Sequence, residues 1–104
     1  MDTNLSALIT RSRKDKEVLA VILFGSKARG EPARDTDICL VLVPKKYTPL
    51  RLSQKKLAYA SDHFDMQVFQ QLPLYIRQRV LSEGKILYCR NIGALYDLAA
   101  SSAR

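Results

Sequence analysis

The sequence predicts an α/β (α+β) domain in which helices flank one sheet of about four strands. Three observations predict this class. The 104 residues suffice for one hydrophobic core and leave too little for two. Short apolar runs rich in branched side chains are bounded by turn residues, and stretches with helical spacing separate these runs. We therefore expect a single domain over 1–104, with strand order and direction left open by the pattern.

The first half is expected to hold one helix and two buried strands. Residues 2–16 have apolar positions at helical spacing and basic residues near the end, which is typical of a helix. Residues 18–24 form a continuous apolar run, which predicts a strand buried on both faces, and Gly25-Ser26 ends it. A second buried strand is predicted over 37–43, before Pro44.

The second half is expected to alternate helices with strands. Residues 63–69 alternate, so that Phe64, Met66 and Val68 share one face of a strand. The other predicted elements are a helix over 51–59 with Pro49 at its start, a helix over 73–82 that Gly84 ends, a strand over 85–89 and a helix over 92–100.

Composition restricts the class of protein. Apolar residues make up 47% and charged residues 26%, as in an ordinary globular protein, which argues against disorder and against a disulfide scaffold. The two cysteines, Cys39 and Cys89, are expected as buried free thiols. No apolar run approaches the ~20 residues that span a bilayer, and Met1–Asn4 lack the features of a secretory signal. We therefore expect a cytoplasmic protein that does not contact a membrane.

The net charge predicts an anionic partner but does not indicate which kind. Lysine plus arginine minus acids is 17 − 10 = +7, so nucleotides, nucleic acid and acidic proteins are all attracted. One basic group is a candidate surface for RNA or an acidic partner, with a merely solvated face as the alternative: Lys45, Lys46, Arg51, Lys55 and Lys56. A nucleic-acid binder is the least favoured hypothesis, because no recognition motif accompanies the charge.

Gly25-Ser26 is a candidate phosphate-binding turn. It lies where a buried strand ends and a helical turn can begin, so free backbone N–H groups and a glycine allow a phosphate to approach the main chain. Lys27 and Arg29 add cationic side chains nearby. A Gly-Ser pair alone is common, and an ordinary turn is the alternative.

Three acids are candidate metal ligands. Asp35 and Asp37 are two residues apart and project to the same side of an extended chain, and Asp65 stands on the polar side of a later strand. Oxygen ligands alone favour Mg²⁺ or Mn²⁺. The alternative is that Asp35 caps the loop, Asp37 begins the strand and Asp65 pairs with a cation, and spacing alone does not choose between the two.

A family resemblance adds to this pattern. Gly25-Ser26, the ten residues Lys27–Thr36 and then Asp37-Ile38-Cys39 resemble the signature of the DNA polymerase β-type nucleotidyltransferase superfamily. The string from Gly25 to Val43 is similar to minimal nucleotidyltransferases, small domains that occur with HEPN toxins as antitoxins. The resemblance implies a palm-like fold with a mixed sheet, ATP as substrate, Mg²⁺ or Mn²⁺ as cofactor and AMP transfer to a tyrosine hydroxyl of the toxin.

The resemblance also implies residue roles. Gly25 and Ser26, with Lys27 and Arg29, would hold the triphosphate, and Asp37 and Asp65 would be the metal-binding and catalytic carboxylates. Cys39 stands at the position of the second carboxylate, where a neutral, soft thiol replaces an acid poorly for Mg²⁺. Asp35 is a candidate substitute.

Two functions therefore remain as hypotheses. The leading one is an ATP- and Mg²⁺-binding adenylyltransferase that modifies a HEPN toxin. The alternative is a binding module of the same fold, catalytically degenerate at Cys39, that neutralises its partner by contact. A domain this small has little room for its own acceptor pocket, so a homo- or hetero-oligomer is expected.

Overall fold

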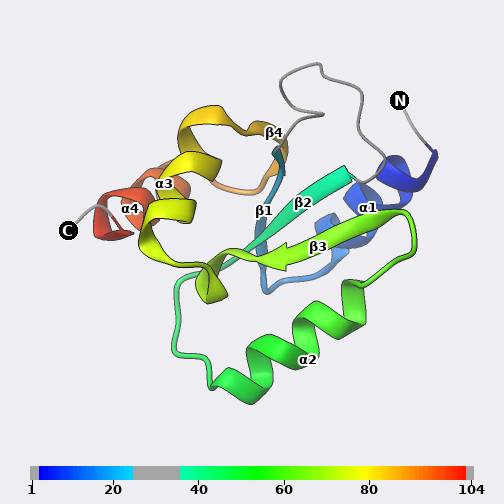
Figure 1. The fold of residues 1–104 in the computed structure, drawn as a ribbon, viewed down its shortest axis with the longest axis horizontal. Helices are drawn as coiled ribbons and strands as arrows, with labels where there is room; N and C mark the ends of the chain where they lie inside the picture. The colour runs from blue at the N-terminus through cyan, green and yellow to red at the C-terminus, as the bar shows by residue number, and fades with distance from the viewer. Residues whose placement is uncertain (1–2, 25–35, 103–104) are drawn as a thin grey trace.

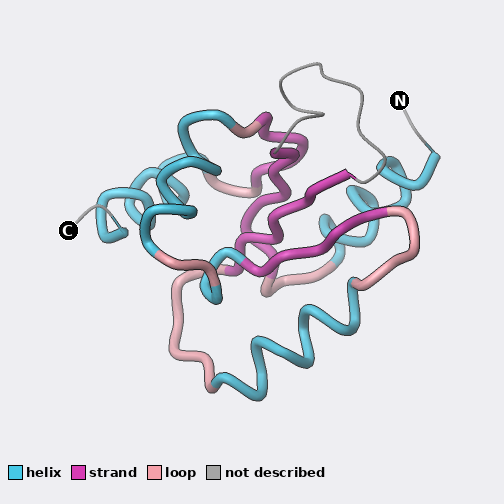
Figure 2. Tube along the Cα trace, in the orientation of Figure 1, coloured by secondary structure: helices cyan, strands magenta, loops and turns pink. Residues whose placement is uncertain are grey.

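The computed structural model describes residues 3–24 and 36–102, and Figures 1 and 2 show the chain. Each predicted helix and strand is present with bounds within two residues of the expected ones, and a short 3₁₀ turn after the third strand was not predicted. The elements are α1 (Thr3–Lys14), β1 (Val18–Phe24), β2 (Thr36–Leu42), α2 (Pro49–Tyr59), β3 (Phe64–Val68), η1 (Phe69–Gln71), α3 (Leu74–Glu83), β4 (Lys85–Cys89) and α4 (Ile92–Ser102).

The four strands form one mixed sheet in the order β3-β2-β1-β4. β1 lies antiparallel to both β2 and β4, whereas β2 and β3 are parallel. Parallel neighbours need a crossover, and α2 supplies it between β2 and β3. The mixed sheet flanked by helices confirms the predicted fold class and supplies the strand order that the sequence left open.

The sheet separates two hydrophobic layers. Successive residues of a strand point to opposite faces, so β1 and β2 serve both layers. One layer joins Val21 and Ile38 to buried residues of α1 and α2, and the other joins Ile22 and Cys39 to buried residues of α3 and α4. In Figure 1, α3 and α4 lie together on one side of the sheet, away from α1 and α2. Across the described ranges, no helix is long and apolar enough to cross a membrane.

An ion cluster ties α2 to the start of β1. The buried Lys55 contacts Asp15 at 2.6 Å and Glu17 at 3.0 Å, and Lys45 and Arg51 also pair with Glu17. The basic group around 45–56 was expected as an anion-binding surface or a solvated face. Lys45 and Arg51 are about half exposed, as expected of a solvated face, whereas Lys55 is buried; intramolecular carboxylates pair with all three cations.

Gly84 ends α3 for a steric reason. Its φ is −73°, which any residue adopts, so no left-handed conformation is required. A Cβ at this position would lie 2.3 Å from the Val80 carbonyl oxygen and 2.5 Å from Cγ2 of Ile22. The glycine therefore allows the end of α3 to pack directly on β1.

Candidate functional site

The ends of three strands meet in one row of the sheet. Phe24, the last residue of β1, pairs with Asp37 of β2, and Asp37 pairs with Asp65 of β3. Neighbouring strands lie about 4.8 Å apart, so the two aspartates are adjacent although 28 positions separate them in sequence. Phe24 also directly precedes Gly25 in the chain.

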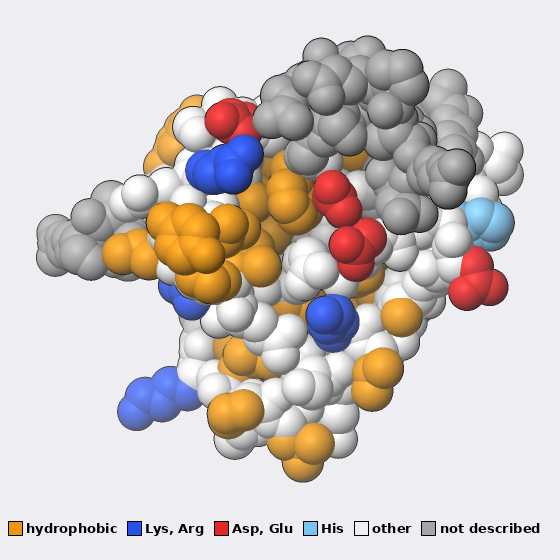
Figure 3. All heavy atoms as spheres, in the orientation of Figure 1, with side chains coloured by type: hydrophobic (Ala, Val, Ile, Leu, Met, Phe, Trp, Pro, Cys, Tyr) orange, Lys and Arg blue, Asp and Glu red, His pale blue; other side chains and the backbone are white. Residues whose placement is uncertain are grey.

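The two carboxylates project to the same face of the sheet. Asp37 alternates with Ile38, and Asp65 alternates with Phe64 and Met66, all of which belong to the layer under α1 and α2. The aspartates therefore project to the opposite face, where α3 and α4 lie. Asp37 is half-buried and Asp65 is exposed. Figure 3 shows two acidic side chains next to each other where β2 and β3 run.

Gln67 connects Asp65 to a cation. Its Nε2 donates to Oδ1 of Asp65 at 3.3 Å, and its Oε1 accepts from Nζ of Lys56 at 3.5 Å. A lysine only donates, so Lys56 fixes the oxygen end of the amide and leaves the nitrogen end to face the carboxylate. The alternative interpretation of the sequence assigned Asp65 a cation as its partner; the structure instead places the amide of Gln67 against it, with Lys56 one step further away.

Cys39 lies on the same face as Asp37, two residues further along β2. Its side chain is fully buried among Phe69, Val80 and other residues of the layer under α3 and α4, and it pairs in register with Gln67. Burial raises the pKa of the Cys39 thiol well above its usual value, an effect that the charge of Arg77 partly offsets. The thiol is therefore neutral at physiological pH and is a poor ligand for a hard cation.

The expectation for the second cysteine needs a correction. Both cysteines are free, as predicted, but only Cys39 is buried, and Cys89 is partly exposed. Cys89 ends β4, which lies at the edge of the sheet among the strands that the structure describes.

Five of the predicted site residues cannot be placed relative to this row. Gly25, Ser26, Lys27, Arg29 and Asp35 lie outside the described residues. Within the described part of the chain, no three His, Cys, Asp or Glu side chains gather as a set that would hold a metal. Asp37 and Asp65 offer carboxylate oxygens, the ligand type that Mg²⁺ and Mn²⁺ prefer, whereas the neutral thiol of Cys39 does not suit these cations.

Two features of this region were not predicted from the sequence. The alternation over 63–69 placed Gln67 on the polar side with Asp65, yet it did not indicate that the two side chains bond to each other. The second feature is a cavity between Phe24 and α3, which depends on the packing of two distant segments. No sequence periodicity reports such packing.

The family is decided by a match over most of the chain. Residues 7–93 match the model of the family described as "Polymerase beta, Nucleotidyltransferase". The chain belongs to this nucleotidyltransferase family. The match includes β1, β2 and β3, so the strands that carry Phe24, Asp37 and Asp65 are those of a nucleotidyltransferase domain.

One curated relative of this nucleotidyltransferase comes from Methanocaldococcus jannaschii. It bears the name "Putative protein adenylyltransferase MJ1547" and is 32% identical over 74 residues. The alignment covers 69% of the present chain and 57% of the relative. The nucleotidyltransferase described here therefore spans little more than half the length of that protein.

Solved structures share the fold at low sequence identity. A chain of a toxin-antitoxin complex with AMP-PNP is 21% identical, with a TM-score of 0.65 over 96% of this chain and 82% of that chain. A chain from the tri-AMPylated Shewanella oneidensis HEPN toxin in complex with MNT antitoxin is 17% identical, with a TM-score of 0.63 over 95% and 77%. These similarities establish the nucleotidyltransferase fold of the whole described chain.

Proposed function

We propose that this nucleotidyltransferase transfers AMP from ATP to a hydroxyl group of a partner protein, and that the partner is a HEPN toxin to which it serves as antitoxin. The name of the M. jannaschii relative and the toxin-antitoxin assemblies among the structural neighbours support this proposal. The observation that carries it is the pairing of Asp37 with Asp65 in one row of the sheet. This row also includes the end of β1, the strand that leads into Gly25-Ser26.

The residues have distinct roles in this proposal. Asp37 and Asp65 hold a divalent cation, Mg²⁺ or Mn²⁺, and the backbone of Gly25 and Ser26 binds the triphosphate. Lys27 and Arg29 balance further phosphate charge. A cation bound at such a site neutralises charge that develops on the phosphate oxygens during in-line transfer.

The exposed position of Asp65 suits an acceptor that arrives from another molecule. The oxygen of the acceptor hydroxyl forms a bond to the α-phosphorus, the bond from that phosphorus to the pyrophosphate oxygen breaks, and Asp65 takes the proton of the hydroxyl. A tyrosine of the partner fits this role, because its phenol reaches far from its own backbone. The domain and its partner would then form a hetero-oligomer.

A second candidate function is favoured by the burial of Cys39. A neutral thiol at the position of a carboxylate removes negative charge from the site, so cation binding is weakened. In this alternative the chain neutralises the toxin by contact alone. ATP and Mg²⁺ are then dispensable, and no modified toxin forms.

The two candidates are separated by one experiment. The chain is incubated with a HEPN toxin and labelled ATP with Mg²⁺, and AMP incorporation is followed by mass spectrometry. We expect incorporation by the wild type and a loss of at least roughly 100-fold in Asp37→Asn and in Asp65→Asn. Asp97→Asn is the matched control, because Asp97 is an exposed acid of α4.

Each outcome has a defined meaning. Unmodified toxin that is nevertheless inhibited establishes the contact mechanism and contradicts AMP transfer. If the wild type transfers AMP and Asp37→Asn transfers it equally well, the assignment of Asp37 to the site is wrong.

A further inference from the structure

A groove lies between α3 and α4 and reaches β4. Its volume is about 410 Å³, and its apolar lining comes from all three elements: Leu81, Ile86, Leu95, Tyr96 and Ala99. Gln78 and Ser82 add polar groups to this lining. We propose that this α3–α4 groove is the contact surface between two copies of the chain, and that Tyr96 of each copy fills the groove of the other.

The composition of α4 indicates that its outer side is covered by another molecule. Asp97 is the only charged residue in the sequence of this helix. Leu95 faces the core and is buried, whereas Ile92 and Tyr96 are 47% and 66% exposed. Ile92, Tyr96 and Ala99 follow the spacing i, i+4, i+7, which places them on one face of the helix. A helix that is apolar on all sides is typically buried on all sides.

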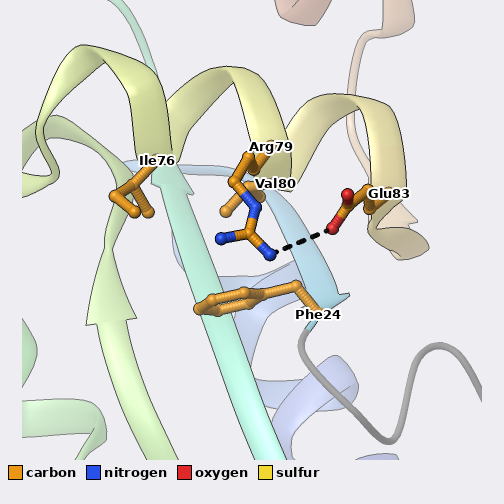
Figure 4. A pocket seen from close by; sticks show the side chains of 5 residues that line it. All are labelled: Phe24, Ile76, Arg79, Val80 and Glu83. Atoms are coloured by element: carbon orange, nitrogen blue, oxygen red, sulfur yellow. Dashed lines mark ion pairs between the residues drawn. The ribbon is translucent and has the colours of Figure 1, made fainter.

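The charges near the groove favour a second copy as the occupant. The chain has a net charge of +7, so two copies repel each other where their basic surfaces meet. Among the described residues, no charged side chain lines the groove. Arg79 and Glu83 of α3 lie on another side of the helix, where they pair with each other above Phe24 (Figure 4). Two copies can therefore meet here without bringing like charges together, whereas the lining offers an acidic partner no cation.

The groove and a side chain that fits it belong to the same surface. Tyr96 lines the groove and is nevertheless largely exposed. A two-fold axis places a surface against the same surface of the second copy, so each Tyr96 meets the groove of the other copy. An apolar cavity of about 150 Å³ accommodates benzene, so a groove of about 410 Å³ has room for the phenol ring. Gln78 and Ser82 offer hydrogen-bond partners to the phenol hydroxyl.

The size of the surface predicts a weak dimer. Stable interfaces between proteins cover about 800 Å² on each partner. α3 and α4 have 10 and 11 residues, so each helix is about 15 Å long. Two such helices packed side by side present a face on the order of 300 Å². We therefore expect a dimer that forms at roughly tens of micromolar rather than a permanent one.

The groove lies at the opposite edge of the sheet from Asp65. The strand order β3-β2-β1-β4 places Ile86 of β4 at one edge and Asp65 of β3 at the other. A dimer formed through the α3–α4 groove therefore keeps the β3 edge of each copy away from the contact. The inference does not depend on the proposed function, and a variant that prevents the dimer should transfer AMP as the wild type does.

Sedimentation velocity at a series of concentrations tests the dimer. The wild type, Tyr96→Ser and Tyr75→Ser are compared from about 1 to about 300 µM. Tyr75 is the matched control, because it is 67% exposed on α3 and does not line the groove. We expect a wild-type dissociation constant between about 10 and 100 µM. Tyr96→Ser should weaken the dimer at least roughly 10-fold, and Tyr75→Ser should leave it unchanged.

A second measurement uses only the wild type. On dilution of the isotope-labelled chain, the NMR amide signals of α4 and of Leu81 and Ser82 should shift, because the dimer dissociates. The signals around Leu57 of α2, a side chain that is 75% exposed, should stay in place.

Four results would overturn the proposal. The first is a wild type that stays monomeric at every concentration, and the second is an equal effect of the two tyrosine variants on the dimer. The third is a dilution shift confined to residues outside the groove. The fourth is a shift of the α4 signals that appears only when a HEPN toxin is added, because the groove would then bind the toxin instead of a second copy.

Discussion

Gln67 donates a hydrogen bond from Nε2 to Oδ1 of Asp65, and Lys56 holds the opposite end of the same amide. This contact fixes the orientation of a carboxylate that is otherwise exposed on β3. Groups that hold a ligand from behind typically change metal affinity by about 10- to 100-fold when removed. Gln67 is therefore a positioning residue for the proposed site.

Replacing Gln67 by methionine tests this role. Methionine keeps the length of the side chain and removes both hydrogen bonds, so we expect Mn²⁺ to bind about 10-fold more weakly with the fold unchanged. Titration of Mn²⁺ by electron paramagnetic resonance measures the affinity. Gln71→Met is the control, since Gln71 is exposed and its amide contacts Ser53 instead. Equal Mn²⁺ affinity in both variants and the wild type would contradict a positioning role.

Cys39→Asp tests whether a carboxylate is missing from the site. Cys39 is fully buried, so a charged replacement without a cation should lower the free energy of unfolding by about 3 kcal/mol or more. Mg²⁺ that binds this carboxylate together with Asp37 should restore the melting temperature, because ligands stabilise the state that binds them. Melting curves of wild type, Cys39→Ser and Cys39→Asp with and without Mg²⁺ measure the effect. If Mg²⁺ does not change the melting temperature of Cys39→Asp, position 39 does not face a cation site.

The ion cluster of α2 and β1 predicts acid sensitivity. Hydrogen bonds from Lys45 and Lys55 lower the pKa of Glu17 from 4.5 to about 2. The unfolded chain therefore takes up the proton first as pH falls, so this contribution to stability is complete above about pH 4.5 and is lost between 4.5 and 2. Glu17→Gln should lose about 1–2 kcal/mol at pH 7 and show a shallower loss of stability in acid. Urea unfolding at a series of pH values measures both, and parallel pH profiles for the two proteins would refute the assignment.

Gly84 and Gly93 form a matched pair of substitutions. A Cβ at Gly84 would overlap backbone and Ile22, whereas among the described residues a Cβ at Gly93 would meet Oδ1 of Asn91 at 3.3 Å and no closer atom. We expect Gly84→Ala to lower the free energy of unfolding by about 1–3 kcal/mol and Gly93→Ala to change it little, since alanine also favours the helix α4. Chemical denaturation gives both values. Similar stabilities of the two variants would mean that α3 shifts away from β1 at low cost.

The sequence predicted the elements of this fold because each has a strong local pattern. The continuous apolar run at 18–24 and the alternation at 63–69 correspond to β1 and β3 within one residue at each end. The strand order could not be predicted, since hydrogen-bonded pairing such as Asp37 with Asp65 joins segments that are distant in sequence. Ion pairs of Lys55 and the contact between Gln67 and Asp65 depend on that order, so they were also inaccessible.

In the candidate site, too, the local motif could be predicted, whereas the surroundings of its side chains could not. The signature around Gly25-Ser26 and Asp37 indicated the family, and the family match over residues 7–93 confirms it. The roles of the individual side chains stay predictions. Burial keeps the thiol of Cys39 neutral. The sequence could not show this burial, because it depends on how the layer under α3 and α4 packs.

The crossover through α2 also determines when this protein acquires its paired acids. Asp37 and Asp65 become neighbours only after the parallel β2–β3 ladder closes, a contact between distant parts of the chain whose loop entropy makes it slow to form. A nascent chain on the ribosome therefore cannot pair Asp37 with Asp65 until the segment beyond Asp65 has emerged. Synthesis and the pairing of the two acids are thus coupled, and a shortened translation product ending within α2 would lack this pair.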